Sequence, residues 1–258
     1  MTGLLKSLAL TFSMFSILPA PAVRWDKENI KYSYIFLPLI GLVIGAAELL
    51  WFRACGRFQV EAALFASVAA LIPVIVSGAI HMDGFIDSCD AVFSYGDKEK
   101  KLEILKDPRA GAFGVIGCAA ILLLQYGLYS QVKASPRFIG VLALSFAISR
   151  ILAGIISVTM KNARASGLGH AFSAGSDKGT VMALLAPAGL IVLTAIGWFD
   201  PWLALAIFLA LSVLTAWFRH FTLKQFGGIT GDLAGAFIVL TETLMLAICS
   251  IGGVLCSL

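Results

Sequence analysis

Apolar stretches of membrane-spanning length recur along almost the whole chain. Seven of them, each close to the roughly 20 residues that a helix needs to cross the hydrocarbon core, lie at 34–52, 59–80, 111–132, 138–158, 181–198, 201–218 and 234–256. The segment near 4–20 is a weaker eighth, which either spans or lies at the interface, because Pro19 and Pro21 end it early. This pattern predicts an all-α fold, a polytopic transmembrane helical bundle of about seven to eight helices.

The composition excludes most other classes of protein. Of the 258 residues, 59% are hydrophobic and only 13% are charged, whereas a soluble domain of this length would need a larger charged shell. Disordered, fibrous and disulfide-rich secreted chains are excluded on the same grounds. Because no linker or repeat divides the sequence, we expect residues 1–258 to form a single integral membrane domain.

Basic residues are distributed unequally between the two sides of these spans. The loops near 23–33, 81–110, 159–180 and 219–233 hold 13 Lys and Arg, and the opposite side holds 5. Since Lys and Arg concentrate in cytoplasmic loops, we expect a multi-pass protein of the cell membrane whose site lies on the cytoplasmic face, where the long loops and the histidines also gather. The net charge of +4 is then an orientation signal, and we expect no nucleic-acid partner.

The most informative segment follows the span at 59–80 and reads His81-Met82-Asp83-Gly84-Phe85-Ile86-Asp87-Ser88-Cys89-Asp90. On a helix, the spacing i, i+4, i+7 places Asp83, Asp87 and Asp90 on one face. Three adjacent anions at a membrane boundary repel one another unless a cation lies among them. Hard oxygen ligands favour Mg²⁺, Mn²⁺ or Ca²⁺, and a few carboxylates that leave room for water and substrate phosphate are typical of Mg²⁺.

Two alternatives to this metal site stay open. The three acids can form a solvated helix end balanced by the lysines downstream, although the remaining helix faces are too apolar for a freely exposed helix. His81 is a ligand, a hydrogen-bond donor to phosphate, or an interfacial side chain.

Three further segments carry candidate phosphate contacts. Arg109 and Gly111 lie where Pro108 precedes the next span, so a guanidinium and backbone N–H groups can hold a phosphate there, with anchoring to lipid phosphate as the alternative. The loop 161–170 supplies Arg164. The segment 227–232 adds three glycines, a hydroxyl and a carboxylate before the last span: Gly227, Gly228, Thr230, Gly231 and Asp232.

Asp232 has three possible roles, as a metal ligand, a general base or the N-cap of the last helix. Three other charges, Glu48, Arg150 and Glu242, lie inside predicted spans, where an internal ion pair is at least as good an explanation as catalysis. Arg150 also lies near enough to a span end to extend towards water. The residues together predict a membrane-embedded, metal-dependent phosphoryl-group transferase.

The same motifs resemble the cobalamin synthases, or adenosylcobinamide-GDP ribazoletransferases. The resemblance runs nearly end to end and is carried by Leu18-Pro19, Phe36–Gly41, His81–Asp90, Lys101–Gly111 with Gly114, Gly167–Gly169, and Gly227–Asp232 with Gly235-Ala236. Ala91 departs from the pattern, since family members often have glycine after the third aspartate.

This resemblance implies transfer of the adenosylcobinamide phosphate group from adenosylcobinamide-GDP to α-ribazole or its 5′-phosphate, with Mg²⁺ as cofactor and GMP as the released product. It implies a metal site of Asp83, Asp87, Asp90 and Asp232, with Asp83, Asp87 and Asp232 catalytic. The substrate-binding residues would be His81, Arg109, Gly111, Arg164, Gly227, Gly228, Thr230 and Gly231.

Two rival functions remain beside this one. A CDP-alcohol phosphotransferase also uses membrane aspartates, but its Asp-x-x-Asp-Gly-x-x-Ala-Arg pattern is absent here. A cation-coupled transporter would use the charges inside the spans, whereas most carboxylates and glycines here gather at one face. The sequence leaves open homo-oligomer formation, the accepted lower base and the number of metal ions.

Overall fold

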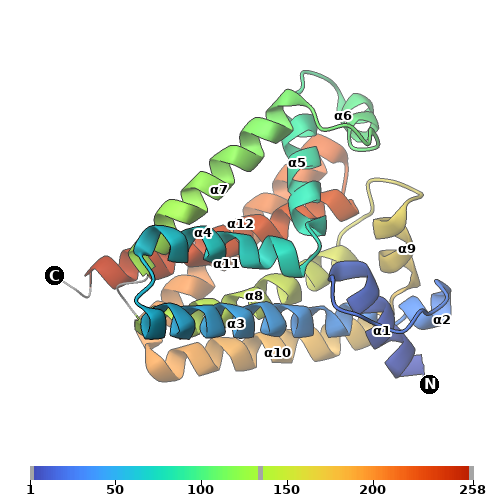
Figure 1. The fold of residues 1–258 in the computed structure, drawn as a ribbon. Helices are drawn as coiled ribbons and strands as arrows, with labels where there is room; N and C mark the ends of the chain where they lie inside the picture. Colours follow the sequence, from blue (N-terminus) through green and yellow to red (C-terminus); the bar gives the residue numbers. More distant parts are fainter. Residues whose placement is uncertain (1–2, 133–135, 256–258) are drawn as a thin grey trace.

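A computed structural model describes residues 3–132 and 136–255 of the chain (Figure 1). Those residues form helices and one isolated β-bridge, between Asn162 and Ile229, and no strand, so the all-α prediction is confirmed. In chain order the helices are α1 (Gly3–Phe15), α2 (Lys27–Ile30), α3 (Ser33–Phe58), α4 (Ala62–Val76), α5 (Ile80–Phe93), α6 (Lys98–Ile104), α7 (Ala112–Val132), α8 (Pro136–Thr159), α9 (Leu168–Gly175), α10 (Lys178–Phe199), α11 (Pro201–Phe226) and α12 (Gly231–Leu255).

Six of the described helices are long and apolar enough to cross a bilayer, namely α3, α7, α8, α10, α11 and α12. Helices α4 and α5 pass the same test only as a pair, and they are bent by 94° relative to each other, so the described part of the chain offers up to seven spans. Helix α1 has 13 residues, about 20 Å of helix, which is too short to cross. The weaker N-terminal candidate is therefore not among the spans.

The bend between α4 and α5 determines where the acidic segment lies. The chain turns at Gly78 and Ala79, which have φ values of 61° and 62°. Ala79 is a non-glycine residue in the left-handed region, a conformation that costs energy and persists only where the surrounding structure holds it. The predicted span at 59–80 consequently ends at Val76, and α5 leaves in a new direction with the three aspartates on it.

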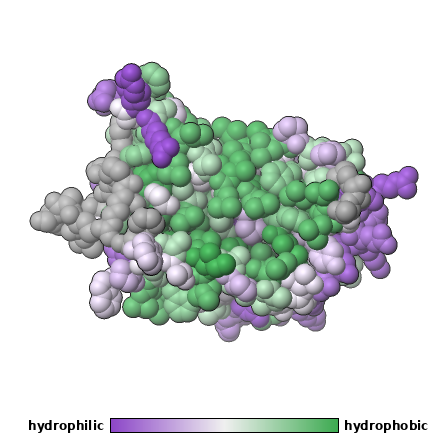
Figure 2. All heavy atoms as spheres, turned by 90° about the horizontal axis from the view of Figure 1, so that it is seen from below, coloured by the Kyte–Doolittle hydropathy of each residue, from purple (hydrophilic) through white to green (hydrophobic). Residues whose placement is uncertain are grey.

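Helices α8 and α12 form the centre of the bundle. Their apolar windows are 78% and 67% buried, against 17% for α10 and α11. Helix α3 packs closely on α8 because Gly41 and Gly45 allow the backbones to touch, at Phe146 and Ala143 respectively. The exposed apolar side chains of the outer helices form the broad hydrophobic surface in Figure 2, with polar residues towards its two ends.

The loops that the charge pattern assigned to one side do lie together. Helix α3 begins, α8 ends and α10 and α12 begin at the same end of the bundle, where α1, α2 and α9 also lie (Figure 1). Lys6 on α1 therefore joins the basic end, which strengthens the predicted charge asymmetry.

Candidate active site

The site begins where α5 crosses the start of α12. Gly84 lies against the backbone of Asp232, so that a Cβ added at Gly84 would be 2.7 Å from the Asp232 carbonyl oxygen. One turn further along α12, Gly235 lies against the backbone of His81 in the same way, at 3.2 Å. These two glycines allow the helices to approach closely, and the close approach brings Asp83 and Asp87 beside Asp232.

Carboxylates outnumber cations in this region. Asp87 interacts electrostatically with Asp83, Asp232 and Asp90, and Arg164 is the cation that acts on it. Arg164 extends from the loop after α8, where its Nη1 lies 3.4 Å from Oδ2 of Asp232 and its Nη2 donates to the Leu102 carbonyl at 3.0 Å. The 161–170 loop, which the sequence marked only as a source of Arg164, therefore lies against the acidic residues.

Asp90 differs from the other two aspartates of its row. It is buried, and its two oxygens accept hydrogen bonds from the backbone N–H groups of Gly111 at 2.7 Å and Gly114 at 2.8 Å. The anion held at the start of α7 is therefore the protein's own Asp90. This arrangement gives both Asp90 and Gly111 a structural role, and we leave them out of the metal and substrate sites proposed below.

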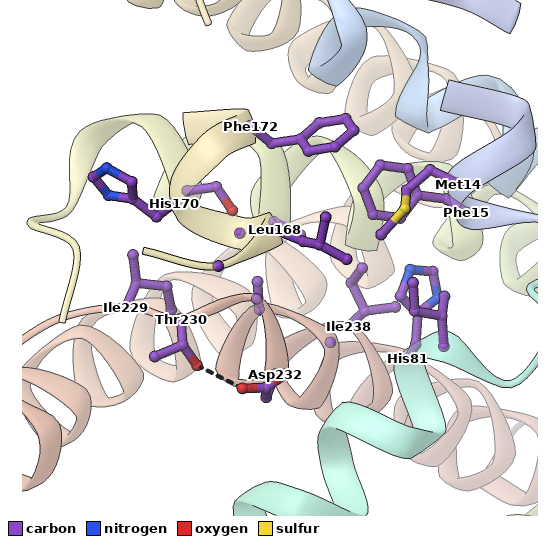
Figure 3. Close-up of a pocket in the computed structure, with 18 of the residues that line it drawn as sticks. Met14, Phe15, His81, Leu168, His170, Phe172, Ile229, Thr230, Asp232 and Ile238 are labelled. Atoms are coloured by element: carbon purple, nitrogen blue, oxygen red, sulfur yellow. Dashed lines mark hydrogen bonds between the residues drawn. The ribbon is translucent and has the colours of Figure 1, made fainter. Parts of the chain in front are cut away.

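A cavity of about 340 Å³ lies beside the acidic residues (Figure 3). It is enclosed by the end of α1, the start of α3, α5, α8, α9, the loop before α9 and the start of α12. Half of the predicted site residues line it: His81, Asp83, Arg164, Thr230, Gly231 and Asp232. The others lie outside the lining: Asp87, Asp90, Arg109, Gly111, Gly227 and Gly228.

The glycine-rich segment before α12 serves mainly for backbone packing. Gly227 ends α11 with a φ of 78°, and Gly228 lies directly against the Lys161 carbonyl. Gly231 faces Gly169, and a Cβ added at Gly169 would lie 2.5 Å from the Gly231 nitrogen. The Ile229 N–H donates to the Lys161 carbonyl and the Ala163 N–H donates to the Ile229 carbonyl, each at 2.9 Å, so the two segments are held together. The glycines thus fix the loop 161–170 onto the start of α12, a role that their sequence alone does not reveal.

Thr230, and not Asp232, caps α12. Its Oγ1 accepts the backbone N–H of Leu233 at 3.2 Å and donates to Asp232 Oδ2 at 3.4 Å. Asp232 is 29% exposed and contacts Arg164 and Thr230 through its side chain. The N-cap alternative for Asp232 is therefore wrong, and its carboxylate is available at the cavity.

Arg109 lies apart from the cavity. Its guanidinium pairs with Asp107 through Nε at 2.9 Å and Nη2 at 2.7 Å, and its side chain is 86% exposed. Hydrogen bonds from Arg109 lower the pKa of Asp107 to about 2. Of the two arginines predicted to hold phosphate, the structure places only Arg164 in the cavity wall.

The charges within the spans are paired internally. Arg150 is fully buried and forms an ion pair with Glu242, while Glu48 accepts a hydrogen bond from Tyr129 at 3.0 Å. An internal ion pair, one of the two explanations left open for these charges, is therefore present between Arg150 and Glu242. The expectation that Arg150 extends towards water is wrong because α8 is central. Residues so satisfied give no support to an ion pathway.

Sequence reasoning missed the apolar part of the cavity wall. Met14 and Phe15 at the end of α1, Tyr34 on α3 and Phe172 on α9 all line it. Nothing in their local sequence marks them, since aromatic residues are frequent along a chain of this hydrophobicity. Helix α1 packs on α3, whereas α9 packs on α2, α8 and α12, and only this packing brings the four side chains together.

The acidic cluster fits a magnesium ion in its donor chemistry. Asp83, Asp87 and Asp232 supply hard oxygen donors with one arginine among them. Across residues 3–132 and 136–255, no group of three His, Cys, Asp or Glu side chains is arranged to hold a metal. The usual Mg²⁺ site takes one or two carboxylates and completes its shell with waters and substrate phosphates.

Fold and site together define a polytopic membrane protein with an acidic, arginine-bearing cavity at one end of its helices, the arrangement expected of a membrane-embedded transferase. A family model described as cobalamin-5-phosphate synthase matches residues 7–250. The chain belongs to this family and is a transferase.

Curated relatives cover almost the whole chain. A protein of Lachnoclostridium phytofermentans named adenosylcobinamide-GDP ribazoletransferase is 37% identical over 92% of this chain and 90% of its own. Proteins of the same name from Clostridium botulinum (strain Alaska E43) and Clostridium perfringens (strain 13) are 33% and 35% identical, over 94% and 92% of this chain and 96% and 94% of theirs. No solved structure matches the chain.

Proposed function

We propose that this protein transfers the adenosylcobinamide phosphate group of adenosylcobinamide-GDP to α-ribazole or α-ribazole 5′-phosphate and releases GMP. The relatives' shared name supports the two substrates. The observation that carries the proposal is the meeting of Asp83, Asp232 and Arg164 in the wall of one cavity. This combination suits phosphoryl transfer, because catalysis depends on positioning and on stabilising charge at the phosphoryl oxygens.

The reaction forms one phosphorus–oxygen bond and breaks another. The ribose 3′-hydroxyl of the acceptor attacks the phosphorus that carries the cobinamide, the bond to the bridging oxygen of the diphosphate breaks, and GMP leaves with that oxygen. The proton of the attacking hydroxyl passes to a carboxylate of the cavity wall. Asp232 takes this role in our proposal, because Arg164 and Thr230 hold its carboxylate in place.

Arg164 acts on the diphosphate. Its guanidinium lies in the cavity wall with its side chain 17% exposed, and the Leu102 carbonyl restrains it through Nη2. A restrained guanidinium can bear the negative charge that develops on the phosphoryl oxygens. The backbone N–H groups at the start of α12 add their positive partial charge at the same end of the cavity.

Mg²⁺ would be held by Asp83 and Asp87, beside the base Asp232. When bound, the ion would neutralise charge on the diphosphate and polarise its phosphorus. We further propose that the protein resides in the cell membrane with this cavity on the cytoplasmic face, where the basic loops gather.

The proposal is tested with the detergent-purified full-length chain. Adenosylcobinamide-GDP and α-ribazole 5′-phosphate are supplied together, and GMP and the cobamide product are measured with Mg²⁺ or with EDTA. We expect both products to appear in equal amounts and only with the metal. Folded protein that forms neither product would overturn the proposal, and CDP-alcohol substrates would then be tested in the same assay.

A further inference from the structure

The cavity has two chemically different ends. Among its lining residues, Asp232 pairs with Arg164 beside Asp83. Phe15, Tyr34 and Phe172, which also line it, contact one another through their rings. Figure 3 shows Thr230 and Asp232 on the start of α12, and Phe15 with the ring of His81 further along the cavity. A single ligand that lies along the cavity therefore needs an apolar body and a polar group.

The apolar end is an ordered aromatic wall. Phe172 meets Phe15 edge to face with ring centroids 5.5 Å apart, and it meets Tyr34 at 6.3 Å and Trp25 at 6.0 Å. Edge-to-face contacts of this kind fix the orientation of each ring. Such a wall favours a flat aromatic ligand over a sugar or a phosphate.

A polar side chain, His81, lies beside this aromatic wall. His81 is 6% exposed and lines the cavity, and its ring lies nearly parallel to that of Phe15, with 16° between the planes. Its Nε2 has no hydrogen-bond partner among the described residues. A buried polar atom left unpaired costs free energy, so a ligand that pairs with Nε2 gains the corresponding amount on binding.

The other nitrogen of the ring determines what Nε2 can offer. Nη2 of Arg150 lies 3.4 Å from Nδ1 of His81. Arginine has only donors, so Nδ1 accepts and the single ring proton is on Nε2. Arg150 is itself held by its ion pair with Glu242 and by a hydrogen bond to Ser149 at 2.9 Å. His81 therefore carries a buried, unpaired N–H donor on a ring that lies beside Phe15 and lines the cavity.

We infer that this end of the cavity binds the flat bicyclic base of the ribazole substrate, with the Nε2–H of His81 donating to the unsubstituted nitrogen of that base, and that Arg150 is the positioning residue that fixes this donor. The inference rests on the proposed function. The ribose then extends towards Asp83 and Asp232. A volume of about 340 Å³ accommodates one small ligand of this kind, so the far larger corrinoid remains outside the cavity and only its phosphate reaches the polar end.

The test compares two ligands that differ in one atom. Binding of α-ribazole and of the matching indole riboside, in which C–H replaces the acceptor nitrogen, is measured by calorimetry on the full-length protein without metal or adenosylcobinamide-GDP. We expect the indole riboside to bind the unaltered protein about tenfold more weakly, because it leaves Nε2–H unpaired. His81→Leu should bind both ligands equally, and His81→Gln, which keeps a donor, should restore part of the preference.

Arg150 is tested with the double variant Arg150→Met/Glu242→Met, which removes both partners of the buried ion pair, so neither charge is left without the other. We expect it to lose most of the preference for α-ribazole because the ring of His81 can then carry its proton on Nδ1. Phe172→Leu should weaken both ligands and leave their ratio unchanged. A preference that survives in His81→Leu would overturn the inference, as would an unaltered preference in the double variant. GMP release by the unaltered protein is scored separately, so failure of the proposed function is distinguishable from failure of this base site.

Discussion

Gly84 on α5 is in direct backbone contact with Asp232 at the start of α12. An added Cβ would lie 2.7 Å from the Asp232 carbonyl oxygen and 2.9 Å from its Cα, and neither atom can move without displacing a helix. The shape of the site thus depends on the absence of one methyl group.

Gly84→Ala should therefore separate α5 from α12. We expect a loss of about 1–3 kcal/mol in unfolding free energy from overpacking, with a larger fall in turnover because Asp83 and Asp232 move apart. Thermal unfolding in detergent and GMP release measure the two effects. The control is Gly127→Ala on α7, where nothing lies within 4 Å and alanine stabilises a helix by about 0.5–1 kcal/mol. Equal stability and equal turnover of the two variants would contradict the close approach of α5 and α12 at Gly84.

Asp90 should behave as a structural cap. Asp90→Asn keeps one acceptor oxygen of the two that bind Gly111 and Gly114, so we expect a loss of roughly 1–2 kcal/mol in stability. The Mg²⁺ concentration that gives half-maximal turnover should not change. A strong shift in this Mg²⁺ requirement, with stability unchanged, would contradict the structural role and show that Asp90 is a metal ligand, as its spacing in the sequence predicted.

The two arginines predicted to hold phosphate should differ in their effect on turnover when each is replaced by lysine. Arg164→Lys removes the forked contact at the cavity, and we expect it to lower kcat/KM by about 10–100-fold. Arg109→Lys alters only an exposed pair with Asp107, and its turnover should stay within about twofold of the unaltered protein. The assignment of Arg164 fails if Arg109→Lys is the more damaging change.

The orientation of the cavity is tested by labelling introduced cysteines. Residue 165 is exposed in the loop between α8 and α9, and residue 57 is exposed near the other end of α3. A membrane-impermeant maleimide should label Ala165→Cys in inverted vesicles and Arg57→Cys in intact cells, each relative to the parent protein. The reverse pattern would place the cavity outside the cell, where the basic loops would violate the usual charge asymmetry.

Local sequence information was sufficient for the parts of the fold that depend on periodicity. The spacing of Asp83, Asp87 and Asp90 indicated a shared face if the segment was helical, and it does lie on helix α5. The shared end of the basic loops follows from the charge count. The cost of isolated charges in hydrocarbon made an internal ion pair one of two explanations for Glu48, Arg150 and Glu242, and the structure shows that Arg150 and Glu242 are the partners.

Other features depend on contacts between distant segments, which spacing cannot reveal. Asp90 shares a helix face with Asp83, yet it caps α7 because Gly111 and Gly114, more than 20 residues away, start that helix beside it. The bend at Ala79 and the aromatic wall likewise arise from how whole helices pack. The glycines at 227–231 suggested an anion site, and their structural role appears only once the loop at 161–169 lies against them.

The most direct test of the account is GMP release by Asp83→Asn, measured beside Glu99→Gln, a change at an exposed residue of α6. Thermal unfolding shows whether both proteins are folded. Asp83 lines the cavity beside Asp232, and loss of its charge removes a proposed metal ligand. We predict a fall of at least about 100-fold in turnover for Asp83→Asn and near-normal turnover for Glu99→Gln. Near-normal turnover of a folded Asp83→Asn would contradict the account.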